Sequence, residues 1–347
     1  MRHLLKTKRV VLFIGFIAIA AFIGSNLPVM AASKPLTLKV HLQARQTKDE
    51  RYQAFEKFAN EVKSRTNGMI EMEGYFTGQL VKDKDTVSAV PQGIVQLAQA
   101  NFGLWAGLVP ELNALDLQML FDSKEHYWRC QDGKLGEVLA NALEKKANTK
   151  LISWMSQGPT DAFISTKKTL RRPEDFKGLK IRAPGQARAM ALESLGASPT
   201  IIAASEAYLA LQRGTIDGII STSRGALLLK WFEVAPYLTR HEAMAPDAAM
   251  GLVMNLDAWN KLSKEQQQIF MDAGRKSILE WTRQVFTEKN EQYWAELKPK
   301  KGVEIYVVPG SEIQMWRSVI IPEQVDFLEK KLSGAADALL DCIEQSR

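Results

Sequence analysis

The sequence predicts an α/β protein built from two lobes, and two features of the chain lead to this fold class. Strand-like apolar segments alternate with helix-like segments between residues 36 and 99, which is the pattern of successive β-α-β units. Such units form right-handed crossovers and a largely parallel sheet. The 315 residues after position 32 are enough to bury two hydrophobic cores. We therefore expect two lobes, each a mixed sheet flanked by helices.

The first 32 residues have the pattern of an export signal. Four basic residues precede a mostly apolar run at residues 10–23, and small residues at Ala31 and Ala32 offer a cleavage site. The apolar run is shorter than the roughly 20 residues that span a bilayer. We expect residues 1–32 to be a signal peptide that directs the protein to the periplasm.

Removal of this segment changes the charge balance. The full chain has a formal charge of +6, and the four basic residues of the segment leave the mature chain near +2. No stretch of the mature chain has the basic clustering that is typical of nucleic-acid binding. We therefore expect no nucleic-acid partner.

The first lobe begins with an alternation of strands and helices. We expect strands at residues 36–42, 70–75 and 95–99, helices at 50–64 and 84–89, and a loop at 100–105. Within the first helix, Ala54, Phe55, Phe58 and Val62 recur at helical spacing. This stripe indicates a face packed against the sheet.

The C-terminal third contains a long helical segment. After a strand at residues 249–255, Ser263 and Gln266 form a capping box that opens a helix running to Leu297. At 1.5 Å per residue this helix would be roughly 50 Å long, which is more than one small lobe spans. We expect it to lie across both lobes. A strand at 303–308 follows, and then a helix at 311–331 that breaks at Pro322.

The middle of the chain places a cation at the end of a strand. Residues 179–182 form a short strand that ends in Arg182 and enters a turn at Pro184-Gly185. Open α/β sheets bind ligands at strand ends, and a guanidinium matches the geometry of a carboxylate. The alternative is a surface arginine paired with a nearby acid. From these residues alone both interpretations stay open.

A helix and a strand follow this turn. Ser205 is a suitable N-cap for the helix, Gly214 stops it, and residues 215–222 form a turn and a strand.

Five motifs in this region resemble, in order and spacing, the periplasmic solute-binding proteins of TRAP transporters. They cover about 70 residues, with weaker similarity from about residue 36 to residue 330. The motifs are RPEDFKGLKIR at 172–182, LGASP at 195–199, SEAY at 205–208, ALQRGTIDG at 210–218 and EVAPYLT at 233–239. The resemblance implies a periplasmic-binding-protein-like fold of type II, with a ligand cleft between two lobes. It also implies capture of an organic acid by lobe closure and delivery to a membrane permease.

In this fold, each lobe is built from two separate stretches of the chain. We expect lobe I to comprise residues 33–157 and about 246–285. Lobe II would comprise residues 158–245 and about 286–347.

The resemblance also assigns roles to individual positions. The arginine of the family's K-I-R motif, which binds the ligand carboxylate, matches Arg182. A second family arginine about 20 residues upstream is replaced here by Asp161. An asparagine after the V-D-G-x-x pattern is replaced by Ser221, and an aromatic residue before S-E-x-Y is replaced by Ala204. These departures suggest a carboxylate other than C4-dicarboxylates and sialic acids.

The remaining candidates have ordinary structural alternatives. Asp161 in the cleft would disfavour a second ligand acid, whereas at the surface it would have no such effect. Arg224 is a candidate to replace the missing second arginine, and Ser221 is either a ligand donor or an ordinary strand-end serine. Trp154 and Trp231 either line the cleft or pack in the core. The predicted ligand-binding residues are Arg182, Asp161, Ser221, Arg224, Trp154, Gln43, Arg45, Asn101 and Phe102.

Enzyme signatures are absent from the sequence. There is no G-x-G-x-x-G, no P-loop and no G-x-S-x-G, and the mature chain has only three well-separated histidines. We therefore expect a monomeric binding protein without catalytic activity, cofactor or metal ion. The alternatives are a binding protein for a sensor or an ABC-type system, and an exported enzyme on the same fold. Cys130 and Cys342 form either a disulfide or two buried thiols.

Overall fold

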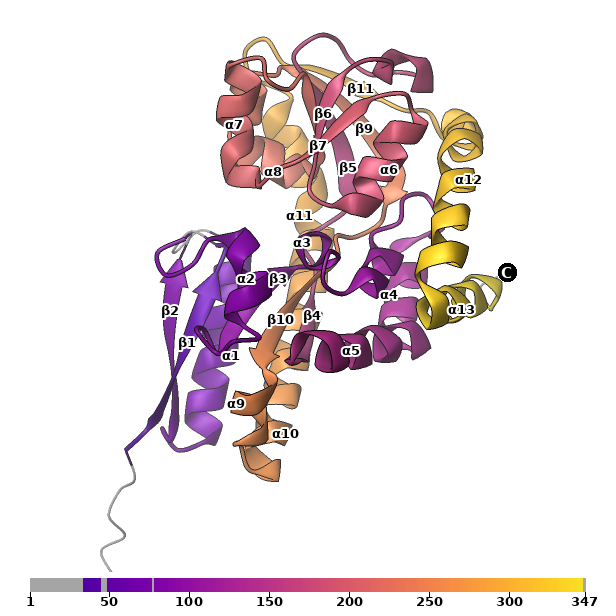
Figure 1. Ribbon diagram of the computed structural model, residues 1–347. Coiled ribbons are helices and arrows are strands. Elements are labelled where there is room, and N and C mark those ends of the chain that lie inside the picture. The colour runs from indigo at the N-terminus through magenta and orange to yellow at the C-terminus, as the bar shows by residue number, and fades with distance from the viewer. Residues whose placement is uncertain (1–33, 45–48, 77, 346–347) are drawn as a thin grey trace, which may run out of the picture. The chain divides into compact units, whose positions relative to one another are not determined.

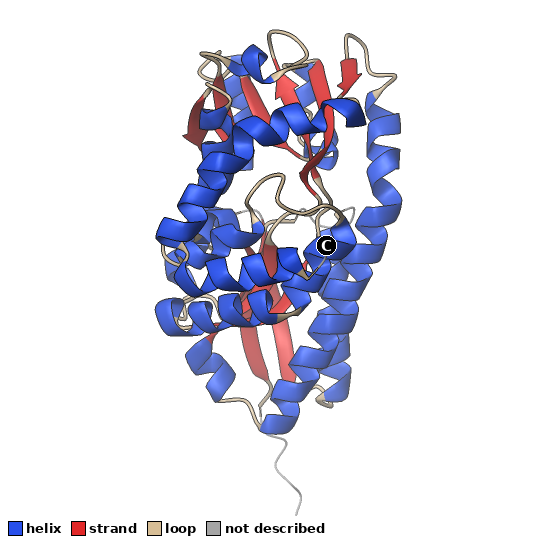
Figure 2. Ribbon diagram, turned by 90° about the vertical axis from the view of Figure 1, so that its right-hand side faces the viewer, coloured by secondary structure: helices blue, strands red, loops and turns tan. Residues whose placement is uncertain are grey.

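The computed structural model describes residues 34–44, 49–76 and 78–345 and contains two β-sheets flanked by helices (Figures 1 and 2). The predicted signal peptide and Arg45 lie outside the described residues. None of the helices in the described part of the chain is both long and apolar enough to cross a bilayer.

The first sheet is mixed and has the strand order β2-β1-β3-β10-β4. Its strands are β1 (Leu36–Leu42), β2 (Ile70–Phe76), β3 (Leu97–Asn101), β4 (Thr149–Met155) and β10 (Met250–Asn255). β1 is parallel to β2 and β3, as the β-α-β pattern predicted. β10 enters between β3 and β4 and is antiparallel to both.

The helices between β1 and β4 cover the first sheet. They are α1 (Glu50–Arg65), α2 (Thr86–Ala89), α3 (Phe102–Trp105), α4 (Lys124–Asp132) and α5 (Lys134–Ala147), with short 3-10 turns at Asp83–Asp85 and Pro110–Leu115. The predicted stripe of α1 is buried against the sheet through Ala54, Phe55, Phe58 and Val62.

The expected loop at residues 100–105 is wrong. β3 continues to Asn101, whose side chain accepts a hydrogen bond from the Gly103 backbone N–H at 3.0 Å. This cap satisfies a donor that a helix start leaves free, so α3 begins directly after the strand.

The second sheet is also mixed and has the order β11-β9-β5-β8-β6-β7. Its strands are β5 (Thr160–Ser165), β6 (Lys180–Ala183), β7 (Ser198–Ile201), β8 (Gly218–Ser221), β9 (Tyr237–Ala245) and β11 (Glu304–Val307). The helices between them are α6 (Gln186–Ser194), α7 (Ala204–Gln212) and α8 (Ser223–Leu228), with 3-10 turns at Pro173–Phe176 and Trp231–Glu233. β6 is parallel to β7 and β8, and β5 is antiparallel to β8 and β9.

Ser205 is not the N-cap of α7, contrary to the prediction. The helix begins at Ala204, and its N-cap is Ala203, which makes no side-chain cap hydrogen bond. Ser205 therefore lies within the first turn.

The predicted long helix is confirmed. After the short α9 (Leu256–Asn260), it consists of α10 (Lys264–Ala273), a π-helical segment (Gly274–Glu280) and α11 (Trp281–Leu297), without interruption. The capping box of Ser263 and Gln266 is present. Phe270 packs in the core of the first sheet and Leu297 in a core of the second, so the helix joins both (Figure 1).

The C-terminal helices also link the two sheets. A 3-10 turn at Gly310–Glu312 leads into α12 (Ile313–Lys331), followed by α13 (Ser333–Glu344). α12 packs on the second sheet through Trp316 and in the core of the first sheet through Leu328. α13 also belongs to the core of the first sheet. The lobe boundaries themselves remain a prediction.

The predicted break at Pro322 does not occur. α12 continues through Pro322 to Lys331. Packing on both sides of the proline, by Ile320 and Phe327, outweighs the one backbone hydrogen bond that a proline removes.

Cys130 and Cys342 form a disulfide, which settles a choice that the sequence left open. Their Cα atoms are 5.7 Å apart, and 212 positions of the chain separate them. The bridge attaches α13 to α4, far from the second sheet.

We expect the Cys130→Ser/Cys342→Ser double variant to lose about 2–4 kcal/mol of unfolding free energy, because a disulfide that closes a long loop restricts the unfolded chain. Urea denaturation will measure this loss. A reducing agent should lower the stability of the wild type but leave the double variant unchanged. Equal stability of oxidised and reduced wild type would contradict the expectation.

A second prediction concerns His241, which is fully buried on β9 beside the rings of Phe163 and Trp316. Burial lowers the pKa of His241 to about 4, whereas an unfolded chain has a histidine pKa near 6.5. As pH falls from 6.5 to 4, the unfolded chain takes up a proton that the folded protein does not. This one residue should therefore reduce stability by about 3 kcal/mol over that window.

The His241→Phe variant isolates this effect, because every other titrating group is shared with the wild type. The difference in unfolding free energy between the two proteins should be constant from pH 8 to 7. It should then shift against the wild type as pH falls from 6.5 to 4. Parallel stability curves over the acidic range would show that His241 is not the cause.

Candidate functional site

Strand ends of the two sheets meet at two places, a close approach of two glycines and a cluster of ion pairs. Gly103 follows β3 and Gly185 follows β6, and a Cβ added to Gly185 would lie 2.7 Å from the Gly103 Cα. Arg224, in α8 after β8, pairs with Asp49 and Glu50 at the start of α1, after β1. β1 and β3 are neighbours in the first sheet, and β6 and β8 are neighbours in the second. The carboxyl ends of parallel strands therefore meet here, where such sheets bind ligands.

Arg182 lies on β6 at this junction and is only 4% exposed. Its Nε donates a hydrogen bond to the backbone oxygen of Ile202 at 2.8 Å. It pairs with Ile219 of β8, so its side chain lies on the same face of the sheet as Ile219. The structure thus places the predicted carboxylate anchor inside the protein rather than on its surface.

Arg182 differs from the other buried arginines. Among the described residues, three arginines are buried: Arg182, Arg188 and Arg224. Arg188 forms an ion pair with Asp116 at 2.6 Å, and Arg224 is paired with two acids. Arg182 has no carboxylate partner in the part of the chain that the structure describes.

The electrostatics of Arg182 reflect this isolation. Burial and, to a smaller extent, the like charge of Arg188 lower the pKa of Arg182 to about 9. A buried charge is costly unless a counter-charge compensates it. A perturbed cation at strand ends is a typical feature of a binding site, and an anionic ligand would supply the missing charge.

Arg224 has the opposite environment. Its Nη2 lies 2.7 Å from Asp49 Oδ1 and its Nε lies 3.3 Å from Glu50 Oε2. The Phe286 ring lies 5.5 Å from the guanidinium carbon. Burial acts to lower the pKa of Arg224, but the charges of Asp49 and Glu50 outweigh burial and raise it. Arg224 is therefore neutralised by the protein itself.

Asp161 is buried and surrounded by donors. A register shift in β5 between Thr160 and Ala162 places it next to α8 and α11. Its carboxylate accepts hydrogen bonds from the Ser223 backbone N–H at 3.1 Å, from Asn290 Nδ2 at 3.2 Å and from Trp294 Nε1 at 2.8 Å. Burial raises the pKa of Asp161 to about 6, although these donors act to lower it. Any contact of Asp161 with a ligand stays a prediction.

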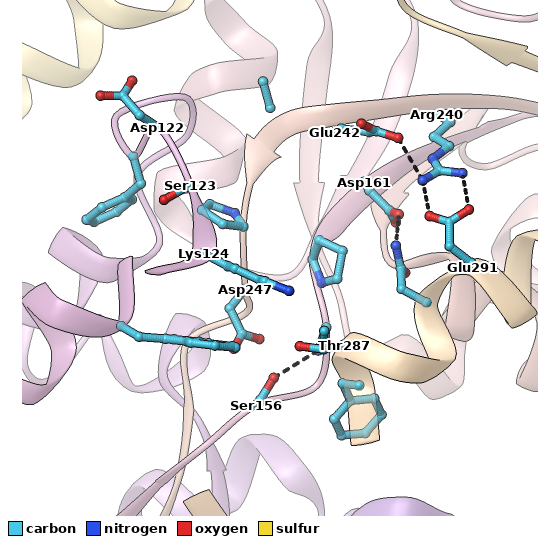
Figure 3. Close-up of a pocket in the computed structure, with 18 residues that line it drawn as sticks. Asp122, Ser123, Lys124, Ser156, Asp161, Arg240, Glu242, Asp247, Thr287 and Glu291 are labelled. Atoms are coloured by element: carbon cyan, nitrogen blue, oxygen red, sulfur yellow. Dashed lines mark hydrogen bonds and ion pairs between the residues drawn. The ribbon is translucent and has the colours of Figure 1, made fainter. Parts of the chain in front are cut away.

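A pocket of about 320 Å³ has Asp161 among its lining residues (Figure 3). It is lined by the start of α4, by β9 and α11, and by the two linkers that join the sheets, residues 156–159 between β4 and β5 and residues 246–249 between β9 and β10. Arg240 pairs with Glu242 and Glu291, and Asp247 accepts hydrogen bonds from Trp128 and from backbone N–H groups. Because these polar groups are partnered by one another, the pocket has a weaker claim to an anionic ligand than Arg182.

The other predicted residues have varied surroundings. The rings of Phe102 and Trp154 pack edge to face at 5.5 Å in the core of the first sheet. Asn101 caps α3, and Ser221 is half-buried at the end of β8. The backbone N–H of Gln43 donates to Gln99 Oε1 at 3.1 Å. Trp231 is buried in a core of the second sheet. Their roles in ligand binding remain predictions.

Sequence reasoning missed the acids that face Arg224. Glu50 also binds Lys289, with Nζ 2.8 Å from Oε1, and Asp49 also binds Arg51 at 2.9 Å. Glu50 and Arg224 are 174 positions apart. The sequence signal near Asp49 is that of a helix N-cap, which does not indicate a partner in the other sheet.

One group of potential metal ligands lies elsewhere. A His126 ring nitrogen and the sulfur atoms of Cys130 and Cys342 lie within 4.8 Å of one another. The two sulfurs are joined in a disulfide and are not the thiolates that bind metals. The group is therefore a structural bridge in this state.

Comparisons with a family model and with known relatives identify the family of this chain. Residues 43–331 match the family model "Bacterial extracellular solute-binding protein, family 7". The chain is 27% identical over 322 residues to the C4-dicarboxylate-binding periplasmic protein DctP of Rhodobacter capsulatus, covering 91% of this chain and 94% of the relative. It is 28% identical over 293 residues to the 2,3-diketo-L-gulonate-binding periplasmic protein YiaO of Escherichia coli, covering 84% and 85%.

Solved structures show the same fold. A TRAP periplasmic solute-binding protein from Sulfitobacter sp. NAS-14.1 with bound β-D-galacturonate superposes with a TM-score of 0.80 at 22% identity, covering 88% of this chain and 99% of the other. The resemblance to TRAP solute-binding proteins is thereby confirmed. This chain belongs to family 7 of the bacterial extracellular solute-binding proteins, a family of binding proteins rather than enzymes.

Proposed function

We propose that this protein binds a small organic carboxylate between its two sheets, with Arg182 as the anchor. The observation that carries the proposal is the burial of Arg182 without a carboxylate partner among the described residues. Arg182 Nε is held by Ile202, which fixes one edge of the guanidinium and leaves Nη1 and Nη2 for a bidentate contact. The relatives named above support the class, because C4-dicarboxylates, 2,3-diketo-L-gulonate and galacturonate all carry carboxylates.

The two cross-sheet contacts support a mechanism in which the protein closes over its ligand. Such closure removes water from a bound ion pair and strengthens it. Opening would separate Gly103 from Gly185 and release the ligand. The long helix and the two linkers join the sheets and would act as the hinge.

We further propose that the closed protein delivers its ligand to the membrane subunits of a TRAP transporter in the periplasm. Residues 1–32 would serve as the export signal, and the mature protein would act as a monomer. These proposals rest on the signal-like sequence and on the family.

Truncation of the anchor gives the first test of the site. An Arg182→Ala variant should bind its carboxylate ligand about 30- to several-thousand-fold more weakly, because loss of a buried charge partner costs about 2–5 kcal/mol. Titration calorimetry will measure this with an organic acid found by thermal-shift screening of the refolded mature chain. Arg213→Ala, at an exposed arginine at the end of α7, is the matched control. Unchanged affinity in a folded Arg182→Ala protein would refute the assignment.

The glycine contact gives a second test. Gly185 has φ −171°, which any residue adopts, and the nearest atoms to an added methyl group are those of the Gly103 backbone. A Gly185→Ala variant should therefore keep its fold but close less completely, and lose at least tenfold in ligand affinity. Small-angle X-ray scattering should show a larger radius of gyration with ligand than for the wild type. Gly107→Ala, where an added Cβ meets nothing within 4 Å, is the control. Wild-type scattering and affinity would show that this contact does not limit closure.

A further inference from the structure

We infer that this site selects organic acids with one carboxylate over dicarboxylates, because Asp49 and Glu50 already neutralise Arg224, the second guanidinium at the same strand ends. The inference rests on the proposed function and deepens it. The family does not decide the question, since its named members include binders of dicarboxylates and of acids with a single carboxylate.

Both arginines lie at or just after the ends of neighbouring strands. Arg182 lies on β6, and Arg224 lies in the first turn of α8, three residues after the end of the adjacent parallel strand β8. Neighbouring strands are about 4.8 Å apart, so the two arginines belong to adjacent strand ends. A dicarboxylate held at Arg182 would therefore direct its second charge toward the region of Arg224.

Arg224 already has two counter-charges. Its Nη2 faces Asp49 Oδ1, its Nε faces Glu50 Oε2, and the Phe286 ring covers its face. Both acids are themselves buried, at 7% and 5% exposure, and come from the opposite sheet's helix α1. A ligand carboxylate approaching Arg224 would meet these two carboxylates and would have to displace them.

Three further cations among the described residues are engaged as well. Arg51 binds Asp49, Lys289 binds Glu50, and Arg188 binds Asp116. Asp161, on neighbouring β5, adds a further acid rather than a base. Within the described residues, Arg182 is therefore the one buried arginine at these strand ends that lacks a carboxylate partner. A second ligand carboxylate would find no unpaired buried arginine among the described residues on closure, and the penalty of burying it discriminates against it.

Matched ligand pairs test this in the wild type. 4-Hydroxybutanoate and succinate differ only in a terminal CH2OH or carboxylate, and so do D-gluconate and D-glucarate. These pairs are placed in a thermal-shift screen with a few hundred other organic acids, and calorimetry of the hits gives dissociation constants. We expect the hits to carry one carboxylate, and the dicarboxylate partner of each hit to bind at least 30-fold more weakly.

Each other outcome is decisive. If dicarboxylates bind as well as or better than their partners and Arg182→Ala abolishes that binding, the inference is overturned while the proposed function stands. If no organic acid stabilises the natively refolded protein, the proposed function fails and the inference fails with it.

Neutral variants of the acids test the cause. Asp49→Asn with Glu50→Gln keeps a residue suited to the N-cap of α1 and removes both charges that face Arg224. The preference for the monocarboxylate should fall at least tenfold, and adding Arg224→Met should restore it. Glu56→Gln, at an exposed acid of the same helix, should change nothing. An unchanged preference in the folded double variant would show that Asp49 and Glu50 do not set the selectivity.

Discussion

The burial of the Arg182 guanidinium is the constraint around which this site is organised. A charge in the interior loses its hydration, and Arg182 has one backbone acceptor, Ile202, in place of a counter-ion. The surrounding structure must supply the energy that holds it there. Part of that energy comes from the apolar core on one face of the second sheet, to which the flanking residues Ile181 and Ala183 belong. A ligand carboxylate would remove the imbalance, which is a physical reason for anion binding to favour the closed protein.

The two sheets are joined by more than the linkers of a simple hinge. The long helix joins a core of each sheet, and so does α12, in which the sequence wrongly predicted a break. Asp161 ties β5 to α8 and α11 through three hydrogen bonds. The π-helical segment lies between α10 and α11, where Ile278 and Trp281 still pack in the core of the first sheet, and the helix reaches a core of the second sheet at Trp294. Relative motion of the sheets must therefore bend helices as well as linkers.

Charge pairing distinguishes the two halves of the junction. Arg224, Asp49 and Glu50 form a cross-sheet cluster that needs no ligand to be balanced, whereas Arg182 does need one. Such a cluster can favour the closed arrangement before any ligand arrives. The acids come from a helix N-terminus, where negative side chains are also stabilised by the helix dipole. The same residues therefore serve α1, the contact between the sheets and the charge balance of the site.

Local sequence patterns determined much of this protein. The strand at 36–42, the stripe of α1, the capping box at Ser263 and the arginine that ends β6 all depend on neighbours within a few residues, which hydrophobic periodicity and capping chemistry report. The family followed from short motifs in register. The loop assigned to residues 100–105 failed because Asn101 caps a helix that is only four residues long.

Only the tertiary structure decided which distant residues pair with one another. The Cys130–Cys342 bridge, the pairing of Arg224 with Asp49 and Glu50, and the isolation of Arg182 join residues far apart in the chain. The sequence placed Arg182 at a strand end but left open whether an acid neutralises it, because burial and charge compensation are properties of the packed interior.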